Sequence, residues 1–147
     1  MSTRMRINRV EPGVYEAMQV ADKMIKGFDI EPKLKELIKI RVSQINGCGY
    51  CLNIHTADAR RMGETEQRLY TLSAWRETAF FTEAEQAAFQ LAEEVTLIAA
   101  HGVSDETYNK AVELLGERTT AQILLIILTI NSWNRIALTT HMLAGKD

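Results

Sequence analysis

The sequence predicts an all-α protein, a single compact domain of six to seven helices over residues 1–147. Apolar residues recur at spacings of three and four, the period of a helix that buries one face. The alternation of Val, Ile and Thr that is typical of half-buried strands does not occur. The periodic stretches are separated by glycines, which suit helix ends: Gly27, Gly63, Gly102, Gly116 and Gly145.

We predict seven helices, over residues 12–27, 32–46, 49–62, 64–75, 82–101, 104–115 and 117–143. Pro12 and Pro32 begin the first two, where the missing backbone N–H has no partner to lose. Thr82 and Glu85 have the spacing of a capping box, and Ser104 is suited to cap the sixth helix. The buried face of the second helix is predicted to consist of Leu34, Leu37, Ile38, Val42 and Ile45.

The last predicted helix is apolar on all sides. It contains the run Ile123 to Leu128, followed by Ile130, so none of its faces is suited to water. Such a helix must be covered all round, either at the centre of the core or in a subunit interface. We therefore expect a central helix and a homo-oligomer.

Composition excludes several classes of partner. The chain has 17 Lys and Arg against 19 Asp and Glu, without a basic cluster, so we expect no nucleic-acid partner. Residues 1–7 lack the apolar core of a signal peptide, and the run Ile123 to Leu128 is too short to span a bilayer. We expect no membrane partner and a cytoplasmic protein, whose cysteines stay reduced unless they cycle.

The two cysteines, Cys48 and Cys51, stand three residues apart at the predicted start of a helix. A disulfide between near neighbours closes a very small loop and so removes little entropy from the unfolded chain. A helix start, however, lowers the pKa of a thiol and favours the nucleophilic thiolate. His55 lies one turn after Cys51 on the same helix face, where an imidazole can take up the thiol proton. The spacing favours redox chemistry.

Glu36 belongs to the preceding predicted helix, and its distance from the cysteines depends on how the two helices are joined. The helices over 32–46 and 49–62 are expected to form an antiparallel hairpin through the turn Asn46-Gly47. If both helices are straight, Glu36 lies ~18 Å from the cysteines, and by position alone it is an exposed acid of the first helical turn.

Zinc is an alternative to redox chemistry. Cys48, Cys51 and His55 could supply three ligands, and His101 or His141 a fourth. Zinc-binding pairs of this spacing usually have a second ligand pair, and His101 and His141 are isolated in the sequence. Haem attachment requires a histidine directly after the second cysteine, where Leu52 stands. Trp75, Trp133 and Tyr70 are predicted to be core or interface aromatics.

The segment from Ser43 to Thr56, SQINGCGYCLNIHT, together with Glu36, resembles the central motif of the AhpD-like alkylhydroperoxidases. These belong to the carboxymuconolactone decarboxylase superfamily. The stretches 63–70, 74–77 and 131–135 are also similar to that family, so the resemblance covers residues 36–142. Its most specific element is an acid twelve residues before C-x-x-C-x-x-x-H.

The resemblance implies an all-α fold with a helical hairpin that bears the two cysteines, and a trimer or hexamer. It implies that Cys51 attacks the peroxide and becomes a sulfenic acid, and that Cys48 resolves it as a disulfide. His55 and Glu36, linked through water, would relay the proton, which requires the second helix to be bent or short. The best-known members carry a histidine where this chain has Tyr50, so Tyr50 is a possible auxiliary residue and a poor base.

The leading hypothesis is a thiol-dependent peroxidase in antioxidant defence, without a cofactor or metal. It would reduce hydrogen peroxide or organic hydroperoxides by cycling Cys48 and Cys51, and an external dithiol would be its reductant. A general thiol–disulfide oxidoreductase with weak peroxidase activity is the first alternative. A zinc-binding or redox-sensing scaffold is the second. The decarboxylase branch of the superfamily usually lacks the cysteine pair, so we do not expect its reaction for this chain.

Overall fold

The structure is a computed structural model that describes residues 4–146. Within these residues it contains helices and no strand, so the predicted all-α class is confirmed. The elements are α1 (Ile7–Val10), α2 (Pro12–Lys26), α3 (Pro32–Asn46), α4 (Gly49–Arg61), α5 (Glu66–Thr71), the 3-10 helix η1 (Leu72–Glu77), α6 (Glu83–Thr96), α7 (Ile98–His101), α8 (Asp105–Leu115) and α9 (Glu117–Thr140).

Several predicted boundaries differ from the observed ones. The short helix α1 was not predicted, and the helix expected over 64–75 is divided into α5 and η1, with a non-helical residue at Ala74. The helix expected over 82–101 breaks at Leu97, among the β-branched Val95, Thr96 and Ile98, whose side chains are stiff in a helix. The last helix ends at Thr140 rather than at residue 143, because the next residue adopts a left-handed conformation.

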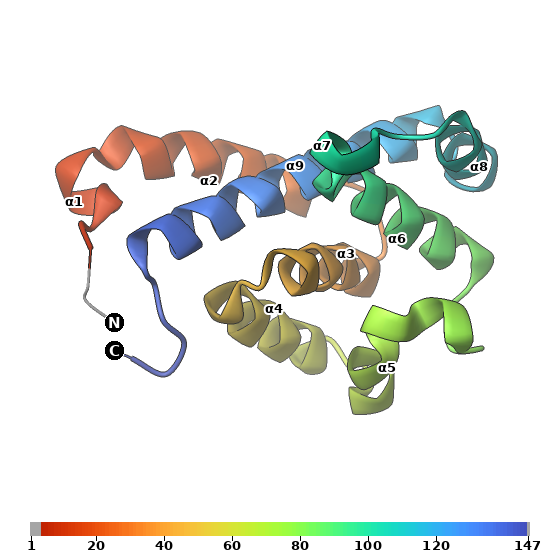
Figure 1. Ribbon diagram of the computed structural model, residues 1–147, viewed down its shortest axis with the longest axis horizontal. Coiled ribbons are helices and arrows are strands. Elements are labelled where there is room, and N and C mark those ends of the chain that lie inside the picture. The colour runs from red at the N-terminus through yellow and green to blue at the C-terminus, as the bar shows by residue number, and fades with distance from the viewer. Residues whose placement is uncertain (1–3, 147) are drawn as a thin grey trace.

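The helix α9 lies at the centre of the molecule (Figure 1). It contacts α2, α3, α4, α6 and α8, and four of its isoleucines are almost completely buried: Ile123, Ile126, Ile127 and Ile130. Leu124 and Leu128, however, remain 39% and 49% exposed, so the expected cover on every side is not provided by one chain. By length and composition α9 could cross a membrane, but a core helix passes the same test.

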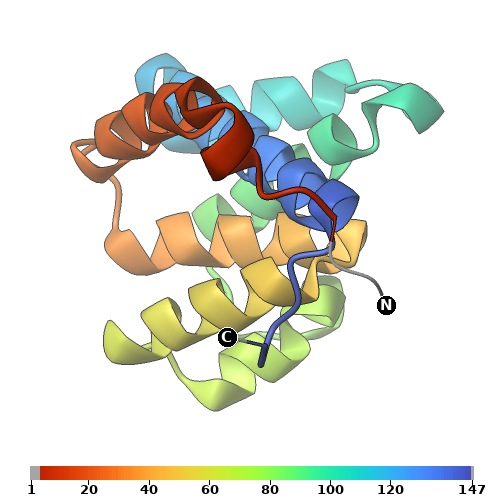
Figure 2. The ribbon, with the colours of Figure 1, turned by 90° about the vertical axis from the view of Figure 1, so that its left-hand side faces the viewer.

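The hairpin of α3 and α4 forms a layer beneath α9, and its two helices run side by side (Figure 2). The buried face of α3 includes Leu34, Leu37, Ile38 and Val42 as predicted, whereas Ile45 is only partly buried. Buried residues from α2 to α9 belong to one hydrophobic cluster, as the proposed single domain requires.

The N-terminal helix α2 lies along α9 and is connected to α3 by a buried lysine. The Lys35 ammonium donates hydrogen bonds to the carbonyl oxygen of Ile25 (2.9 Å), in the last turn of α2, and to that of Phe28 (2.6 Å), just after the helix ends. A cation is favoured at this end of a helix. Burial, followed by repulsion from Lys39, lowers the pKa of Lys35. This contact holds α2 over the hairpin.

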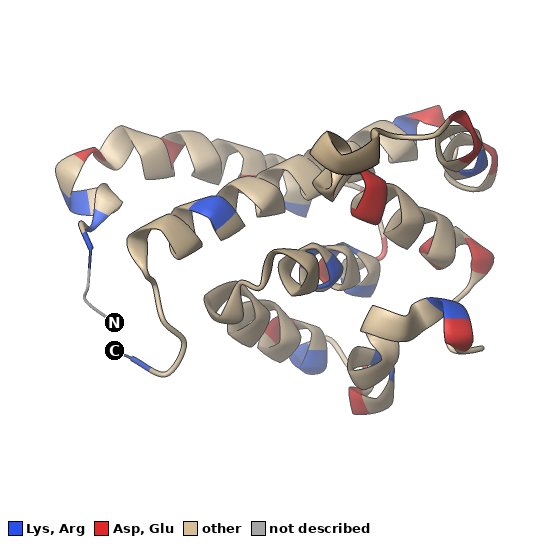
Figure 3. Cartoon of the chain, viewed as in Figure 1, with Lys and Arg blue, Asp and Glu red and all other residues tan. Residues whose placement is uncertain are grey.

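Charged residues of both signs are interspersed along the helices in Figure 3, without a face of one sign. This distribution agrees with the near-balanced composition.

Candidate active site

The turn between α3 and α4 places Cys48 at the start of α4. Gly47 is left-handed (φ 69°), a conformation that glycine adopts without steric cost. The N–H of Cys48 donates to the carbonyl of Ser43 (3.0 Å), and that of Gly47 to the carbonyl of Gln44 (3.3 Å), which is the bonding pattern of a Schellman motif. Cys48 is also the N-cap of α4, since its Sγ accepts a hydrogen bond from the N–H of Cys51 (3.4 Å). The predicted position of the pair at the helix start is therefore confirmed.

The two cysteines form a disulfide, with their Cα atoms 5.4 Å apart. Cys48 is 1% exposed and Cys51 4% exposed. Cys51 lines the cavity described below, whereas Cys48 does not. A molecule in the cavity can therefore meet Cys51 but not Cys48.

His55 and Glu36 are in direct contact across the hairpin. The Nδ1 atom of His55 lies 2.8 Å from Oε2 of Glu36, so the water that was expected between them is not needed. The helix α3 is also not short, because it continues unbroken for 15 residues. The separation of ~18 Å that was expected for straight helices is the distance from Glu36 to the cysteines, not to His55. His55 lies one turn farther from the bend than Cys51, and it is therefore nearer to Glu36.

Glu36 is buried rather than an exposed acid of the first turn, with an exposed fraction of 4%. Its Oε1 accepts a hydrogen bond from Nζ of Lys39 at 2.7 Å. Burial by itself raises the pKa of Glu36, but the hydrogen bond from His55 and the charge of Lys39 outweigh it, and the pKa lies below its usual value. The carboxylate is thus ionised at neutral pH.

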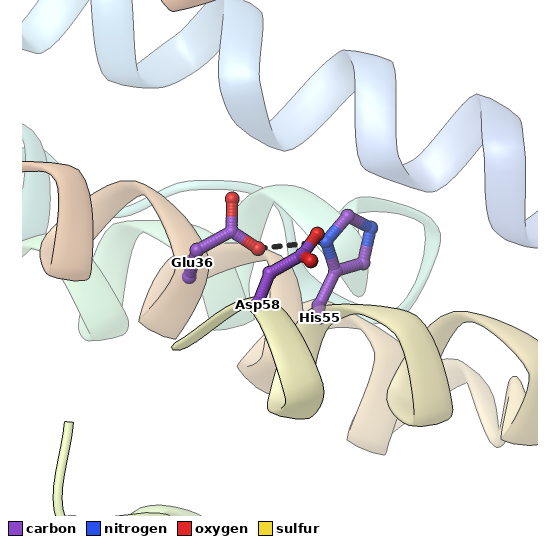
Figure 4. A group of neighbouring side chains, drawn as sticks. All are labelled: Glu36, His55 and Asp58. Atoms are coloured by element: carbon purple, nitrogen blue, oxygen red, sulfur yellow. Dashed lines mark hydrogen bonds and ion pairs between the residues drawn. The ribbon is translucent and has the colours of Figure 1, made fainter. Parts of the chain in front are cut away.

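Asp58 is a second carboxylate beside His55 and comes from the next turn of α4 (Figure 4). Potential ligand atoms of Glu36, His55 and Asp58 all lie within 4.8 Å of one another, a spacing that could hold a metal ion. Both carboxylates already have cationic partners, since Glu36 pairs with Lys39 and Asp58 with Arg61. A metal ion would have to displace or oppose these charges, so the donor set fits a proton relay better than a metal centre.

A cavity of about 580 Å³ opens next to Cys51 and lies among α2, α3, α4 and α9. Glu36, Tyr50 and His55 also line it. The surrounding wall is largely apolar and includes Ile25, Ile54, Met62, Ile126 and Ile130. Its size and lining are those of a pocket for a small organic molecule.

Aromatic residues from the two ends of the chain complete the cavity wall. The Tyr15 ring of α2 meets the Trp133 ring of α9 edge to face, with centroids 5.0 Å apart. The Tyr15 hydroxyl donates to the sulfur of Met142 (3.7 Å), and Nε1 of Trp133 donates to Asp22 (3.0 Å). Burial, followed by repulsion from Tyr50, raises the pKa of Tyr15, so its hydroxyl remains protonated.

The sequence did not identify Tyr15, Lys39 or Asp58 as site residues, and it assigned Trp133 to the core or an interface. Lys39 and Asp58 each lie three residues from a predicted site residue, and this helical spacing was an available signal. Nothing local indicated that Tyr15 would lie over the cavity, because that position depends on how α2 packs on α9.

The remaining predicted residues lie in varied positions. Trp75 is a core residue as predicted, with its Nε1 donating to Glu93 (2.8 Å), whereas Tyr70 is 69% exposed and is not part of the core. His101 is exposed at the end of α7, next to the carbonyl of Gly102. His141 is the left-handed residue that ends α9. In their disulfide form, Cys48 and Cys51 do not present the thiolates that zinc requires.

Comparison with known proteins agrees with this architecture. Residues 12–94 match the model of the carboxymuconolactone decarboxylase family. The uncharacterised protein YdfG of Bacillus subtilis (strain 168) is 46% identical over 138 residues, which are 94% of each chain.

Solved structures are also similar to this chain. A protein of unknown function from Agrobacterium tumefaciens, provisionally assigned as the antioxidant defence protein AhpD, gives a TM-score of 0.94 at 29% identity, over 99% of this chain and 100% of that one. The debrominase Bmp8 in complex with 2,3,4-tribromopyrrole gives 0.81 at 23% identity, over 89% and 70%, and shares the fold. Since the family model covers more than half of the chain, the protein belongs to the carboxymuconolactone decarboxylase family, and its fold is AhpD-like.

Proposed function

We propose that the protein is a thiol-dependent peroxidase that reduces hydroperoxides through a Cys48–Cys51 dithiol–disulfide cycle. One arrangement carries the proposal. A redox-capable cysteine pair lies at the start of α4, and only Cys51 faces the cavity, one helical turn from a histidine bonded to a buried carboxylate. The provisional assignment of the Agrobacterium protein to antioxidant defence supports the same activity.

The cycle has three steps. The Cys51 thiolate attacks one peroxide oxygen and the O–O bond breaks. The other oxygen leaves as an alkoxide, which takes up a proton and becomes an alcohol. The resulting Cys51 sulfenic acid is attacked by the Cys48 sulfur, which forms the disulfide and releases water. An external dithiol then reduces the disulfide by exchange and becomes oxidised itself.

The burial of the two sulfurs supports this division of roles. Cys51 lines the cavity and can meet a hydroperoxide there, while Cys48 is hidden behind it in the turn. A reducing thiol that reaches the pair through the cavity would meet Cys51 first. A small or long-armed dithiol suits this approach better than a dithiol fixed on the surface of a large protein, because both sulfurs are almost completely buried.

The contact between His55 and Glu36 defines the direction of proton transfer. An ionised carboxylate only accepts hydrogen bonds, so Nδ1 of His55 donates to Glu36. In the neutral imidazole the free lone pair is then on Nε2. We assign Nε2 as the base that receives the Cys51 proton, directly or through water, and that returns a proton to the leaving oxygen.

The apolar wall of the cavity favours organic hydroperoxides over hydrogen peroxide as substrates. Tyr50 lines the same cavity and can donate a hydrogen bond to a peroxide oxygen.

We also propose that the protein is a homo-oligomer, a trimer or hexamer. The partly exposed Leu124 and Leu128 on α9 support this, because a second subunit could cover them. The location that we propose is the cytoplasm.

The activity is tested with the fully reduced protein, a slight excess of cumene hydroperoxide and a panel of dithiols that includes dihydrolipoamide. We expect Cys51→Ser to abolish peroxide consumption. We expect Cys48→Ser, mixed with peroxide in the absence of any dithiol, to reduce one equivalent of peroxide and to leave a sulfenic acid that dimedone traps on Cys51. Circular dichroism of both variants provides the control for folding.

Three outcomes would contradict the proposal. Peroxide consumption at the wild-type rate by both variants would show that the cysteines are not the reacting groups. Oxidation of the reduced protein by disulfides but not by hydroperoxides would instead indicate a general thiol–disulfide oxidoreductase. Stoichiometric zinc in the reduced protein, without redox cycling, would indicate a metal-binding scaffold.

A further inference from the structure

The resolving step of the proposed cycle requires that Cys48 be held within reach of Cys51. The position of Cys48 depends on the last turn of α3, because its N–H is bonded to the carbonyl of Ser43. It also depends on the left-handed turn at Gly47, which directs the chain into α4. Whatever fixes Ser43 and the end of α3 therefore fixes Cys48.

A buried cluster of polar side chains joins the end of α3 to α9. The side-chain amide of Asn46 donates hydrogen bonds to Oδ1 of Asn131 and Oδ1 of Asn134, both at 2.9 Å. The side-chain amide of Asn134 in turn donates to Oγ of Ser43 at 3.0 Å. Asn134 and Ser43 are both 0% exposed. Asn134 thus bridges the first and last residues of the helical turn that ends at the cysteine loop.

The other end of the cluster is fixed to the core. The side-chain amide of Asn131 donates to Oγ1 of Thr96 on α6 (3.0 Å), and its Oδ1 accepts from the Arg135 guanidinium (2.7 Å). Among the described residues no buried side-chain N or O atom is without a hydrogen-bond partner. A buried network in which each polar atom has a partner favours one geometry, because a displacement would leave a polar group without one.

We propose that Asn134 is a positioning residue for the redox pair, which acts through Ser43 and Asn46 to hold Cys48 against Cys51. The assignment to the resolving step rests on the proposed peroxidase function, whereas the effect on the disulfide equilibrium does not. The cluster includes neither His55 nor Glu36, which form their own contact farther along the hairpin. Its loss should therefore affect the joining of the two sulfurs and leave the activation of Cys51 unchanged.

The first test measures the equilibrium between the dithiol and disulfide forms in glutathione buffers, which requires no peroxide. Two variants are compared with the wild type: Ser43→Ala, which removes one hydroxyl, and Asn134→Ala, which removes the bridge. We expect the constant for disulfide formation to fall ~10-fold in Asn134→Ala and less in Ser43→Ala, because loosening the turn lowers the effective concentration of one thiol at the other.

The matched control is Thr107→Ala on α8. Thr107 is also buried and hydrogen-bonded, but its hydroxyl donates to Glu94 (2.7 Å), away from the cysteines. The Thr107→Ala variant shows how the loss of a buried hydrogen bond far from the cysteines affects the equilibrium. We expect its equilibrium constant to stay within about twofold of the wild-type value, since distant sites act independently.

The second test separates the two steps of one turnover by rapid mixing with cumene hydroperoxide. In Ser43→Ala and Asn134→Ala, formation of the Cys51 sulfenic acid should keep its rate within about twofold, while the sulfenic acid persists up to ~10-fold longer before the disulfide forms. A structural role alone would not produce this split.

The proposal is overturned if Ser43→Ala and Asn134→Ala both retain the wild-type glutathione equilibrium. It is also overturned if Thr107→Ala shows the same decrease, which would indicate a general loss of stability. If the equilibrium shifts as expected but the protein does not consume hydroperoxides, the positioning role stands and the proposed peroxidase function fails.

Discussion

Glu36 on α3 and Glu93 on α6 are two buried carboxylates in contrasting surroundings. Glu93 accepts hydrogen bonds from Arg41 (2.8 Å), Trp75 (2.8 Å) and Arg76 (2.7 Å). All three donors keep their protons at ordinary pH. Glu36 is bonded instead to Lys39 and to His55, and an imidazole can act as a donor or an acceptor of protons.

The contrast separates Glu93, which is held by donors in the core, from Glu36, which we propose takes part in the reaction. Burial raises the pKa of each, and the hydrogen-bond donors outweigh it, so both pKa values lie below the usual one. Only Glu36 lines the cavity beside Cys51. A lowered pKa and deep burial do not distinguish the two residues, whereas a titratable partner facing a cavity does.

The largest expected effect comes from replacing the titratable partner itself. His55→Gln retains an amide that can donate to Glu36 but cannot accept the thiol proton. We expect the rate of Cys51 oxidation by cumene hydroperoxide at pH 7 to fall by ~10²–10⁴-fold, the usual contribution of a general base. The rate is measured under excess peroxide, with the exposed Asn53→Ala on the same helix as control. A wild-type rate in His55→Gln would remove histidine from the mechanism.

The next largest effects are expected when each of the two carboxylates is replaced by glutamine. Glu93→Gln leaves the partly buried Arg41 without its counter-ion and should lower the free energy of unfolding by about 3 kcal/mol, with Cys51 oxidation within about twofold. Glu36→Gln should lower the oxidation rate by ~10²-fold, because the amide oxygen can still accept from His55 but no longer carries the negative charge that stabilises the protonated imidazole. Urea unfolding and single-turnover oxidation are measured on both variants. Equal effects on stability and rate in the two variants would break the comparison.

The smallest effect is the pH dependence of stability, which adds Glu94, the neighbour of Glu93 on α6. Burial raises the pKa of Glu94, but hydrogen bonds from Ser104, Thr107 and Gln90 outweigh it and lower the pKa from 4.5 to about 2. A carboxyl whose pKa is lower in the folded state stabilises the protein fully above pH 4.5, and this contribution is lost as the pH falls toward 2.

We therefore expect the midpoint of urea unfolding to decrease between pH 4.5 and 2, and to decrease less steeply in Glu94→Gln. An identical slope in the wild type and in Glu94→Gln would contradict this assignment. Since Glu36 and Glu93 also have lowered pKa values, part of the slope should persist in that variant.

Capping residues in the sequence predicted the starts of α6 and α8 correctly. The capping box is present, since the hydroxyl of Thr82 accepts from the N–H of Glu85 (3.2 Å), and the Glu85 carboxylate accepts from the N–H of Thr82 (2.8 Å). Ser104 caps α8 as expected. These features depend on residues within one turn of each other. Helix ends inside periodic stretches were predicted less well, as at Leu97, because periodicity continues through a break.

The candidate site was predicted in part. The positions of Cys48 and Cys51 at a helix start follow from local spacing, and so does the register of Cys51 with His55. The direct contact of Glu36 with His55 did not follow, because it depends on the alignment of two helices rather than on the rise of one. The place of Tyr15 at the cavity was missed for the same reason, since α2 reaches it only by packing on α9.

The sequence by itself determined the all-α class, the helix starts marked by a proline or a capping residue, and the redox-capable pair at the beginning of α4, because each depends on interactions between residues a few positions apart. The tertiary structure decided which buried acid faces a titratable histidine, which sulfur faces the cavity and what anchors the cysteine turn. These features join α2, α3, α4 and α9 across long stretches of chain, and only the packing of the core brings such residues within hydrogen-bond distance.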